Sequence, residues 1–143
     1  MTDRAFVDTN IIVYLFDLAE KEKRPKATEL ISTLIDKQKP CISVQVLNEF
    51  INVVTKKIEN KLSSEELIKR IEVLNEIFFI APIKYTTTRK ALELQVKYQF
   101  SFWDSLIIAS AIENECKIIY SEDFQHKQVV ENRIVIINPF LNK

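Results

Sequence analysis

The hydrophobic and polar positions between residues 101 and 112 fit a helix that is apolar on every side. Leu106, Ile107, Ile108 and Ile112 point in different directions around the helix axis, which is typical of a helix buried inside a domain. Asp104 places a carboxylate in its first turn. We expect Trp103, in the same turn, to be mostly buried, because an all-round apolar helix leaves a large side chain little exposed surface.

Short apolar runs alternate with amphipathic helical patterns along the rest of the chain. The predicted strands are 4–7, 40–43, 78–81, 117–120 and 133–137, and the predicted helices are 11–16, 25–37, 44–57, 64–76, 86–98 and 101–112. Such alternation predicts an α/β fold with three layers, in which helices cover both faces of a central parallel sheet of four to five strands. The 143 residues suit one domain, residues 1–143.

Four carboxylates fall at positions that this fold would bring together. Asp8 and Asp123 follow the first and fourth strands, and right-handed crossovers can place these strands side by side at the sheet centre. Glu49 borders the apolar stripe of its helix, and Asp104 begins the buried helix. Because both helices can flank the same crevice, we expect Asp8, Glu49, Asp104 and Asp123 to share one pocket.

Each of these acids also has a local explanation. Ser101 and Asp104 fit a capping box, and an acid in a first turn interacts favourably with the helix dipole. Glu49 could be a solvated side chain on a helix flank. Glu122, next to Asp123, is a second candidate ligand at the end of the fourth strand.

A shared acidic pocket favours metal-dependent chemistry on phosphodiesters. Like charges held together destabilise a fold unless a cation compensates them, and an oxygen-only site suits Mg²⁺ or Mn²⁺. Such an ion can activate water and stabilise charge on a phosphodiester. The sequence therefore predicts hydrolytic cleavage of a nucleic-acid backbone.

Composition excludes several other classes. The chain has no glycine, which excludes a P-loop and a dinucleotide fingerprint. The single His126 excludes a mechanism built on two histidines. Cys41 and Cys116 are isolated in apolar surroundings, which indicates reduced core residues of a cytoplasmic protein. No apolar run approaches the roughly 18 residues of a membrane helix, and the N-terminus lacks the pattern of a secretion signal.

Charge gives no general attraction for nucleic acid, because 20 basic residues balance 20 acidic ones. Contact with RNA would have to be local. The candidates are basic side chains on helices and near their ends, although most of them are expected to be solvated helix faces: Lys56, Lys57, Lys61, Lys84, Arg89 and Lys90.

Four short motifs, in this order and spacing, resemble the PIN-domain ribonucleases, and specifically the VapC-type toxins of toxin-antitoxin pairs. The motifs are Phe6-Val7-Asp8-Thr9-Asn10, Asn48-Glu49-Phe50, Trp103-Asp104-Ser105-Leu106-Ile107 and Tyr120-Ser121-Glu122-Asp123-Phe124-Gln125-His126. The resemblance covers essentially the whole chain, and it therefore implies a PIN-like fold.

The resemblance also implies roles for individual residues. Asp8, Glu49, Asp104 and Asp123 match the metal-binding and catalytic acids of the family. Thr9, Asn10 and Ser121 match positions that usually support those acids or bound water. Similar proteins are Mg²⁺- or Mn²⁺-dependent endoribonucleases, commonly homodimers, silenced by an antitoxin that occupies the active-site groove; transfer RNA is a common target.

Some features depart from this pattern or leave alternatives. Lys127 stands where relatives tend to have glycine, which affects the loop after the last acid. A phosphatase of the Asp-x-Asp type would need an acid at position 10, where this chain has Asn10. The chain also lacks the paired early acids and strand-end lysine of a receiver domain. A non-toxin RNA-processing PIN nuclease and a PIN-like RNA- or protein-binding module without catalysis remain alternatives.

Overall fold

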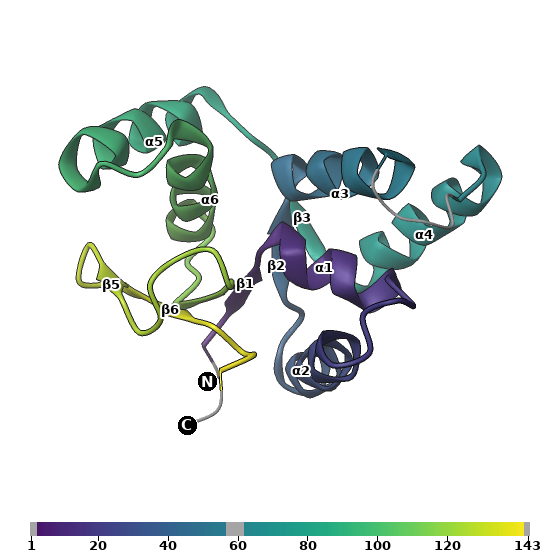
Figure 1. The fold of residues 1–143 in the computed structure, drawn as a ribbon. Helices are drawn as coiled ribbons and strands as arrows, with labels where there is room; N and C mark the ends of the chain where they lie inside the picture. The colour runs from purple at the N-terminus through teal and green to yellow at the C-terminus, as the bar shows by residue number, and fades with distance from the viewer. Residues whose placement is uncertain (1–2, 57–61, 142–143) are drawn as a thin grey trace.

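The computed structural model describes residues 3–56 and 62–141. A six-stranded sheet, in the order β3-β2-β1-β4-β6-β5, forms the middle layer (Figure 1). All neighbouring strands pair in parallel except β5 and β6, which are antiparallel. The strands are β1 (Ala5–Val7), β2 (Cys41–Ser43), β3 (Phe79–Ala81), β4 (Ile118–Tyr120), β5 (Val129–Val130) and β6 (Ile134–Ile137).

Helices cover both faces of this sheet, which confirms the predicted three-layer α/β/α architecture. In Figure 1, α1 to α4 lie to the right of the sheet, and α5 and α6 lie to the left. The helices are α1 (Thr9–Phe16), α2 (Lys23–Lys37), α3 (Val44–Lys56), α4 (Ser64–Ile77), α5 (Tyr85–Tyr98) and α6 (Phe102–Glu113). None of the helices in the described residues is both long enough and apolar enough to span a membrane.

The side on which the chain adds new strands changes at the centre of the sheet. The chain adds β2 and β3 on one side of β1 and then returns to place β4 on the other side. The predicted adjacency of the first and fourth strands is therefore confirmed, with Val7 paired to Tyr120. The carboxyl ends of two strands at such a reversal border a crevice, which is the usual ligand site of an open α/β sheet.

Local signals explain most element boundaries. Ser63 Oγ accepts a hydrogen bond from the Glu66 N–H at 3.2 Å, and the Glu66 carboxylate accepts one from the Ser63 N–H at 3.1 Å, so the predicted capping box is confirmed. Helix α2 begins at Lys23, earlier than predicted, and Pro25 occupies its first turn. The predicted sheet lacked β5, because a strand of two residues is too short to show the alternation of apolar and polar positions.

Helix α6 is the buried helix that the sequence predicts, but the prediction for Trp103 is wrong. Residues 105–111 are all buried, whereas Trp103 is 62% exposed. All-round burial begins only in the second turn. The first turn projects at the carboxyl end of the sheet, where Trp103 lines a cavity instead of the core.

Turns in this chain are built without glycine. In the described part of the chain, five residues have left-handed backbone angles, where φ is positive and glycine is ordinarily favoured. They are Gln99, Glu115, Lys127, Glu131 and Asn132. Lys127, at the position where the family resemblance leads us to expect glycine, has a φ of 68°. The loop therefore has a glycine-like conformation at a cost of about 1 kcal/mol.

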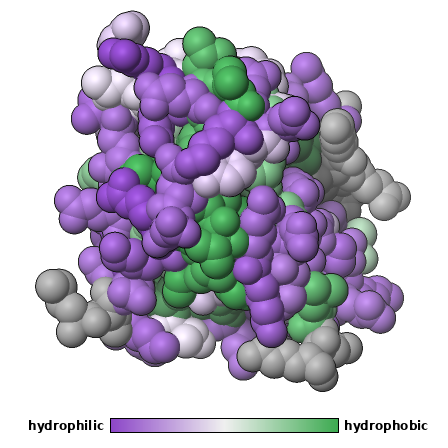
Figure 2. Space-filling model, turned by 90° about the vertical axis from the view of Figure 1, so that its left-hand side faces the viewer, coloured by the Kyte–Doolittle hydropathy of each residue, from purple (hydrophilic) through white to green (hydrophobic). Residues whose placement is uncertain are grey.

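The face formed by α5 and β5 is mainly hydrophilic, with hydrophobic side chains showing in a few places (Figure 2). On these elements the exposed large hydrophobic side chains are Tyr85, Leu92 and Val96 of α5 and Val129 of β5. Leu92 and Val96 lie one turn apart and therefore form a short apolar stripe on α5.

Candidate active site

The ends of β1 and β4 place Asp8 and Ser121 side by side. The Asp8 N–H donates to the carbonyl oxygen of Tyr120 at 3.0 Å, which extends the parallel ladder by one residue. Ser121 Oγ donates to Asp8 Oδ2 at 2.6 Å and accepts from the Asp123 N–H at 3.1 Å. One buried hydroxyl thus connects the acid after β1 with the acid after β4.

The first turn of α1 supplies the next connections. The Thr9 N–H donates to Asp8 Oδ1 at 2.7 Å, and Thr9 Oγ1 donates to Glu49 Oε1 at 2.7 Å. Asn10 Nδ2 donates to Asp123 Oδ2 at 2.9 Å. Three of the acids are therefore held by donors from Thr9 and Asn10, directly after β1.

Asp8 is the most buried of the acids, with 5% of its surface exposed. Burial raises the pKa of its carboxyl to about 6, hydrogen bonds from Ser121 and Thr9 oppose that rise, and the charges of Asp123 and Glu49 add to it. Asp8 therefore lies within electrostatic reach of two further carboxylates. Its charged form is costly to keep at neutral pH.

Asp104 approaches the same place from the other face of the sheet. Burial raises the pKa of its carboxyl, a hydrogen bond with Ser101 lowers it, and the charges of Asp123 and Glu49 raise it. Ser101 Oγ also accepts the Asp104 N–H at 3.0 Å, so the local capping explanation holds for Ser101 as the N-cap. The Asp104 carboxyl nevertheless lies within electrostatic reach of Asp123 and Glu49.

The donor set fits a hard divalent cation that keeps part of its hydration shell. Within residues 3–56 and 62–141, no group of three His, Cys, Asp or Glu side chains is close enough to hold an ion by itself. Mg²⁺ needs only one or two direct carboxylates and retains several waters. Besides the carboxylates, the buried Oδ1 of Asn10 has no hydrogen-bond partner, which adds an oxygen suited to the same ion.

A cavity of about 430 Å³ opens beside these acids. At one end it is lined by Thr9, Asn10, Glu49 and Asp123, and it continues between α1 and α3 along Val13, Tyr14, Asn52 and Val53. A second cavity of about 500 Å³ is lined by Glu49 and Trp103. Glu49 is common to both cavities.

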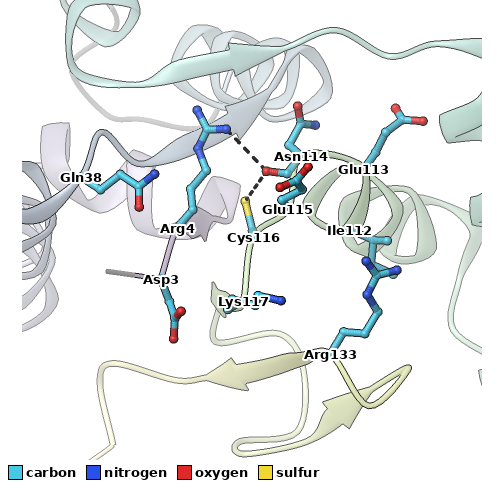
Figure 3. Close-up of a pocket in the computed structure, with 10 residues that line it drawn as sticks. All are labelled: Asp3, Arg4, Gln38, Ile112, Glu113, Asn114, Glu115, Cys116, Lys117 and Arg133. Carbon is cyan, nitrogen blue, oxygen red and sulfur yellow. Dashed lines mark hydrogen bonds between the residues drawn. The ribbon is translucent and has the colours of Figure 1, made fainter. Parts of the chain in front are cut away.

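A larger cavity of about 650 Å³ lies at the opposite, amino end of the strands (Figure 3). Arg4, Cys116 and Lys117 line it, and Arg4 donates to the carbonyl oxygen of Asn114 at 3.5 Å. None of the four predicted acids lines this cavity. Since ligands of open α/β sheets bind at the carboxyl ends, the smaller, acid-lined cavity is the candidate site.

Glu122 is held by two partners that the sequence did not reveal. Its carboxylate accepts from Lys23 Nζ at 2.8 Å and from the Tyr14 hydroxyl. This ion pair favours Asp123 over Glu122 as the ligand after β4. Lys23 appeared only as part of a charged segment, so no sequence signal identified it.

Gln45 is a further residue that sequence reasoning missed. Its Nε2 donates to Glu49 Oε2 at 3.4 Å and to the carbonyl oxygen of Trp103 at 3.1 Å. Gln45 therefore links α3 to the first turn of α6. The spacing of four residues between Gln45 and Glu49 on one helix could have indicated the first of these contacts.

The basic candidates for RNA contact divide into two groups. Arg89 pairs with Glu93 at 3.7 Å and Lys90 pairs with Glu131 at 3.0 Å, so the charges of both are compensated. Lys56 is exposed seven residues after Glu49 on α3, on the same helix face.

The other three basic candidates are less informative. Lys84 directly precedes α5. The start of α5 lies next to the end of α6, since the Thr86 hydroxyl donates to Glu113 at 2.6 Å. That is the end of α6 opposite Asp104. Lys57 and Lys61 lie outside the described residues.

Comparison with known proteins gives one family and a consistent set of folds. A family model for the PIN domain matches residues 5–132. A toxin-antitoxin complex from Klebsiella pneumoniae superposes with a TM-score of 0.70 at 18% identity, over 94% of this chain and 97% of that chain. VapBC2 from Rickettsia felis, bound to a promoter DNA fragment, gives a TM-score of 0.65 at 18% identity, over 92% and 96% of the two chains.

VapC20 from Mycobacterium tuberculosis, described as a sarcin-ricin loop cleaving toxin, gives a TM-score of 0.63 at 18% identity, over 83% and 89% of the two chains. A search of curated proteins finds no match. At these identities the solved structures show that the fold is shared.

Proposed function

The chain belongs to the PIN-domain family, and on this basis we propose that it is a metal-dependent endoribonuclease that hydrolyses RNA phosphodiester bonds. The observation that carries the proposal is the meeting of acids at the carboxyl ends of β1 and β4. The proposed catalytic and metal-binding residues are Asp8, Glu49, Asp104 and Asp123.

Three of the four acids have hydrogen-bond donors that fix their orientation. The two Asp8 oxygens accept from the Thr9 N–H and the Ser121 hydroxyl, Glu49 accepts from Thr9 Oγ1, and Asp123 accepts from Asn10 Nδ2. Thr9, Asn10 and Ser121 are therefore positioning residues. Mg²⁺ or Mn²⁺ bound by these carboxylates would lower the pKa of a water and stabilise charge on the phosphodiester.

Electrostatics favours catalysis over a binding module without chemistry. The charged form of Asp8 is disfavoured by burial and by neighbouring carboxylates, and a surface that only held RNA would lose affinity through such negative charge. A bound divalent cation reverses both effects. The acidic cluster is thus useful to a metal-dependent nuclease and costly to a passive binder.

We further propose that the protein is the cytoplasmic toxin of a toxin-antitoxin pair. The solved structures that share its fold include a toxin-antitoxin complex and a toxin described as cleaving the sarcin-ricin loop. The proposed partners are a cognate antitoxin protein and a structured RNA, with transfer RNA as the first candidate. A small neighbouring gene whose product restores growth when co-expressed would support the toxin role over general RNA processing.

A homodimer is part of the same proposal. The stripe formed by Leu92 and Val96 on α5 is exposed in the single chain, and burying it against a second copy would remove apolar surface from water. We expect this stripe to contribute to the dimer interface.

Incubation of the purified protein with transfer RNA and ribosomal RNA tests the proposed activity. We expect cleavage in Mg²⁺ or Mn²⁺, loss of cleavage in EDTA, and loss of cleavage in Asp104→Asn. Asp36→Asn, which removes a carboxylate from the exposed side of α2, is the matched control and should cleave normally. RNA that is bound but left intact would instead support the binding module.

A further inference from the structure

We propose that Trp103 forms a nucleobase subsite beside the acids, on which one base of the RNA substrate stacks. The proposal rests on the proposed ribonuclease function and adds a substrate contact to it. Trp103 is 62% exposed although it belongs to the most buried helix of the chain. An open tryptophan ring next to a proposed catalytic acid, Asp104, is the observation that needs an explanation.

The ring is held in place before any ligand binds. Phe102 meets it edge-on, with ring centroids 5.4 Å apart and an interplanar angle of 75°. The Trp103 carbonyl oxygen accepts from Gln45 Nε2 at 3.1 Å, and the same Nε2 donates to Glu49 at 3.4 Å. Because one buried amide contacts both residues, the backbone that carries the ring and an acid of the site have a common support.

The cavity beside the ring has room and largely apolar walls for a base. Its volume is about 500 Å³, and aliphatic side chains of Val44, Ile83 and Leu106 line it together with Trp103. Flat apolar faces suit such walls, and stacking on an aromatic ring is tolerant of base identity because every base has a π-face. The cavity therefore predicts affinity for an unpaired base without strong sequence preference.

Continuity with the acid-lined cavity identifies the occupant as RNA. Glu49 lines both the cavity of the acids and the cavity of Trp103. If one phosphate of an RNA strand lies at the acids, the base of the adjoining nucleotide lies close to that phosphate. The Trp103 cavity lies within reach of such a base, and stacking there would remove the apolar faces of the base from water.

Trp103 is the only tryptophan of the chain, so its fluorescence reports directly on stacking. The probe is single-stranded oligoadenylate in Mg²⁺, added to Asp8→Asn protein to avoid cleavage. We expect strong quenching of the Trp103 fluorescence. The quenching should saturate at the same RNA concentration as binding, which is measured separately by the anisotropy of labelled RNA. An oligomer of the same length with abasic riboses should bind more weakly and quench little.

Kinetics of cleavage give the second readout. Trp103→Leu keeps an apolar side chain but removes the ring, and we expect its KM to rise about tenfold with a smaller change in kcat. Trp103→Phe should recover most of the loss. Tyr85→Leu, which removes another exposed aromatic ring on α5, is the matched control and should behave as wild type.

Two results would overturn the subsite while leaving the ribonuclease intact. One is RNA binding without a change in Trp103 fluorescence, and the other is a wild-type KM for Trp103→Leu. Quenching by an apolar partner peptide but not by RNA would reassign the cavity to a protein partner. Absence of any metal-dependent cleavage by wild type is the separate result that removes the proposed function itself.

Discussion

Replacing Asp8 with asparagine should stabilise the metal-free protein while abolishing cleavage. Asparagine keeps the shape of the side chain and removes its charge. The rise in the Asp8 pKa from 3.8 to about 6 corresponds to a cost of about 3 kcal/mol for the ionised carboxylate at neutral pH. This cost is already net of the hydrogen bonds from Ser121 and Thr9. Asparagine has only one oxygen for these two donors, and leaving one of them without an acceptor costs about 2 kcal/mol, so the net gain is on the order of 1 kcal/mol.

The pH dependence of this gain follows from the direction of the shift. Because the pKa of Asp8 is higher in the folded protein than in the unfolded chain, the folded state holds the proton more tightly. The contribution of Asp8 to the free energy of unfolding is therefore complete below about pH 4 and is lost as pH rises through about 6. Asp8→Asn should equal or trail wild type at pH 4 and exceed it at pH 7.5.

Chemical unfolding in EDTA at several pH values measures this difference, and melting curves with Mn²⁺ extend it. Wild type should gain melting temperature in Mn²⁺, since the ion binds the folded site, and Asp8→Asn should gain much less. Asp36→Asn is again the control and should respond to Mn²⁺ as wild type does. A metal-free Asp8→Asn protein markedly less stable than wild type at pH 7.5, with an unchanged Mn²⁺ response, would refute the shared acidic pocket.

Three further predictions concern other parts of the structure. Lys127→Gly should raise the free energy of unfolding by about 1 kcal/mol, because glycine has no Cβ to strain the left-handed backbone at φ 68°. Urea titration measures this free energy, and a decrease would contradict the prediction. Lys56→Ala should weaken RNA binding and reduce its salt dependence by about one charge, whereas Arg89→Ala, whose guanidinium is paired with Glu93, should change neither; equal effects in a filter-binding assay would contradict the assignment. Val96→Glu should shift a dimer towards monomer in sedimentation experiments, and an unaltered dimer would exclude the α5 stripe from the interface.

The layered fold was predictable because its signals are local and periodic. The all-round apolar pattern after Asp104 identified the buried helix, and the crossover rule placed the first strand next to the fourth. The same reasoning failed for Trp103, because the pattern gives the average burial of a helix and not the point at which it leaves the core. Strand β5 was missed because its pairing with β6 depends on tertiary contact.

The candidate site was only partly predictable from residues. Strand ends indicated Asp8 and Asp123, and the charge of Asp123 does raise the pKa of Asp8 and of Asp104. The supporting roles of Thr9 and Asn10 came from resemblance to the family, because nothing in their spacing shows which acid they contact. The Lys23 and Glu122 pair joins residues 99 positions apart, and no pattern along the chain reports such a contact.

Cleavage of RNA in isotopically labelled water tests the central claim most directly. The purified protein acts on RNA in Mn²⁺, and mass spectrometry identifies the new ends. If the acids hold a metal ion that promotes hydrolysis, the products carry linear phosphates with one oxygen from the labelled solvent, and none form in EDTA. Products ending in unlabelled 2′,3′-cyclic phosphate, or the same products in EDTA, would contradict metal-dependent hydrolysis at this site.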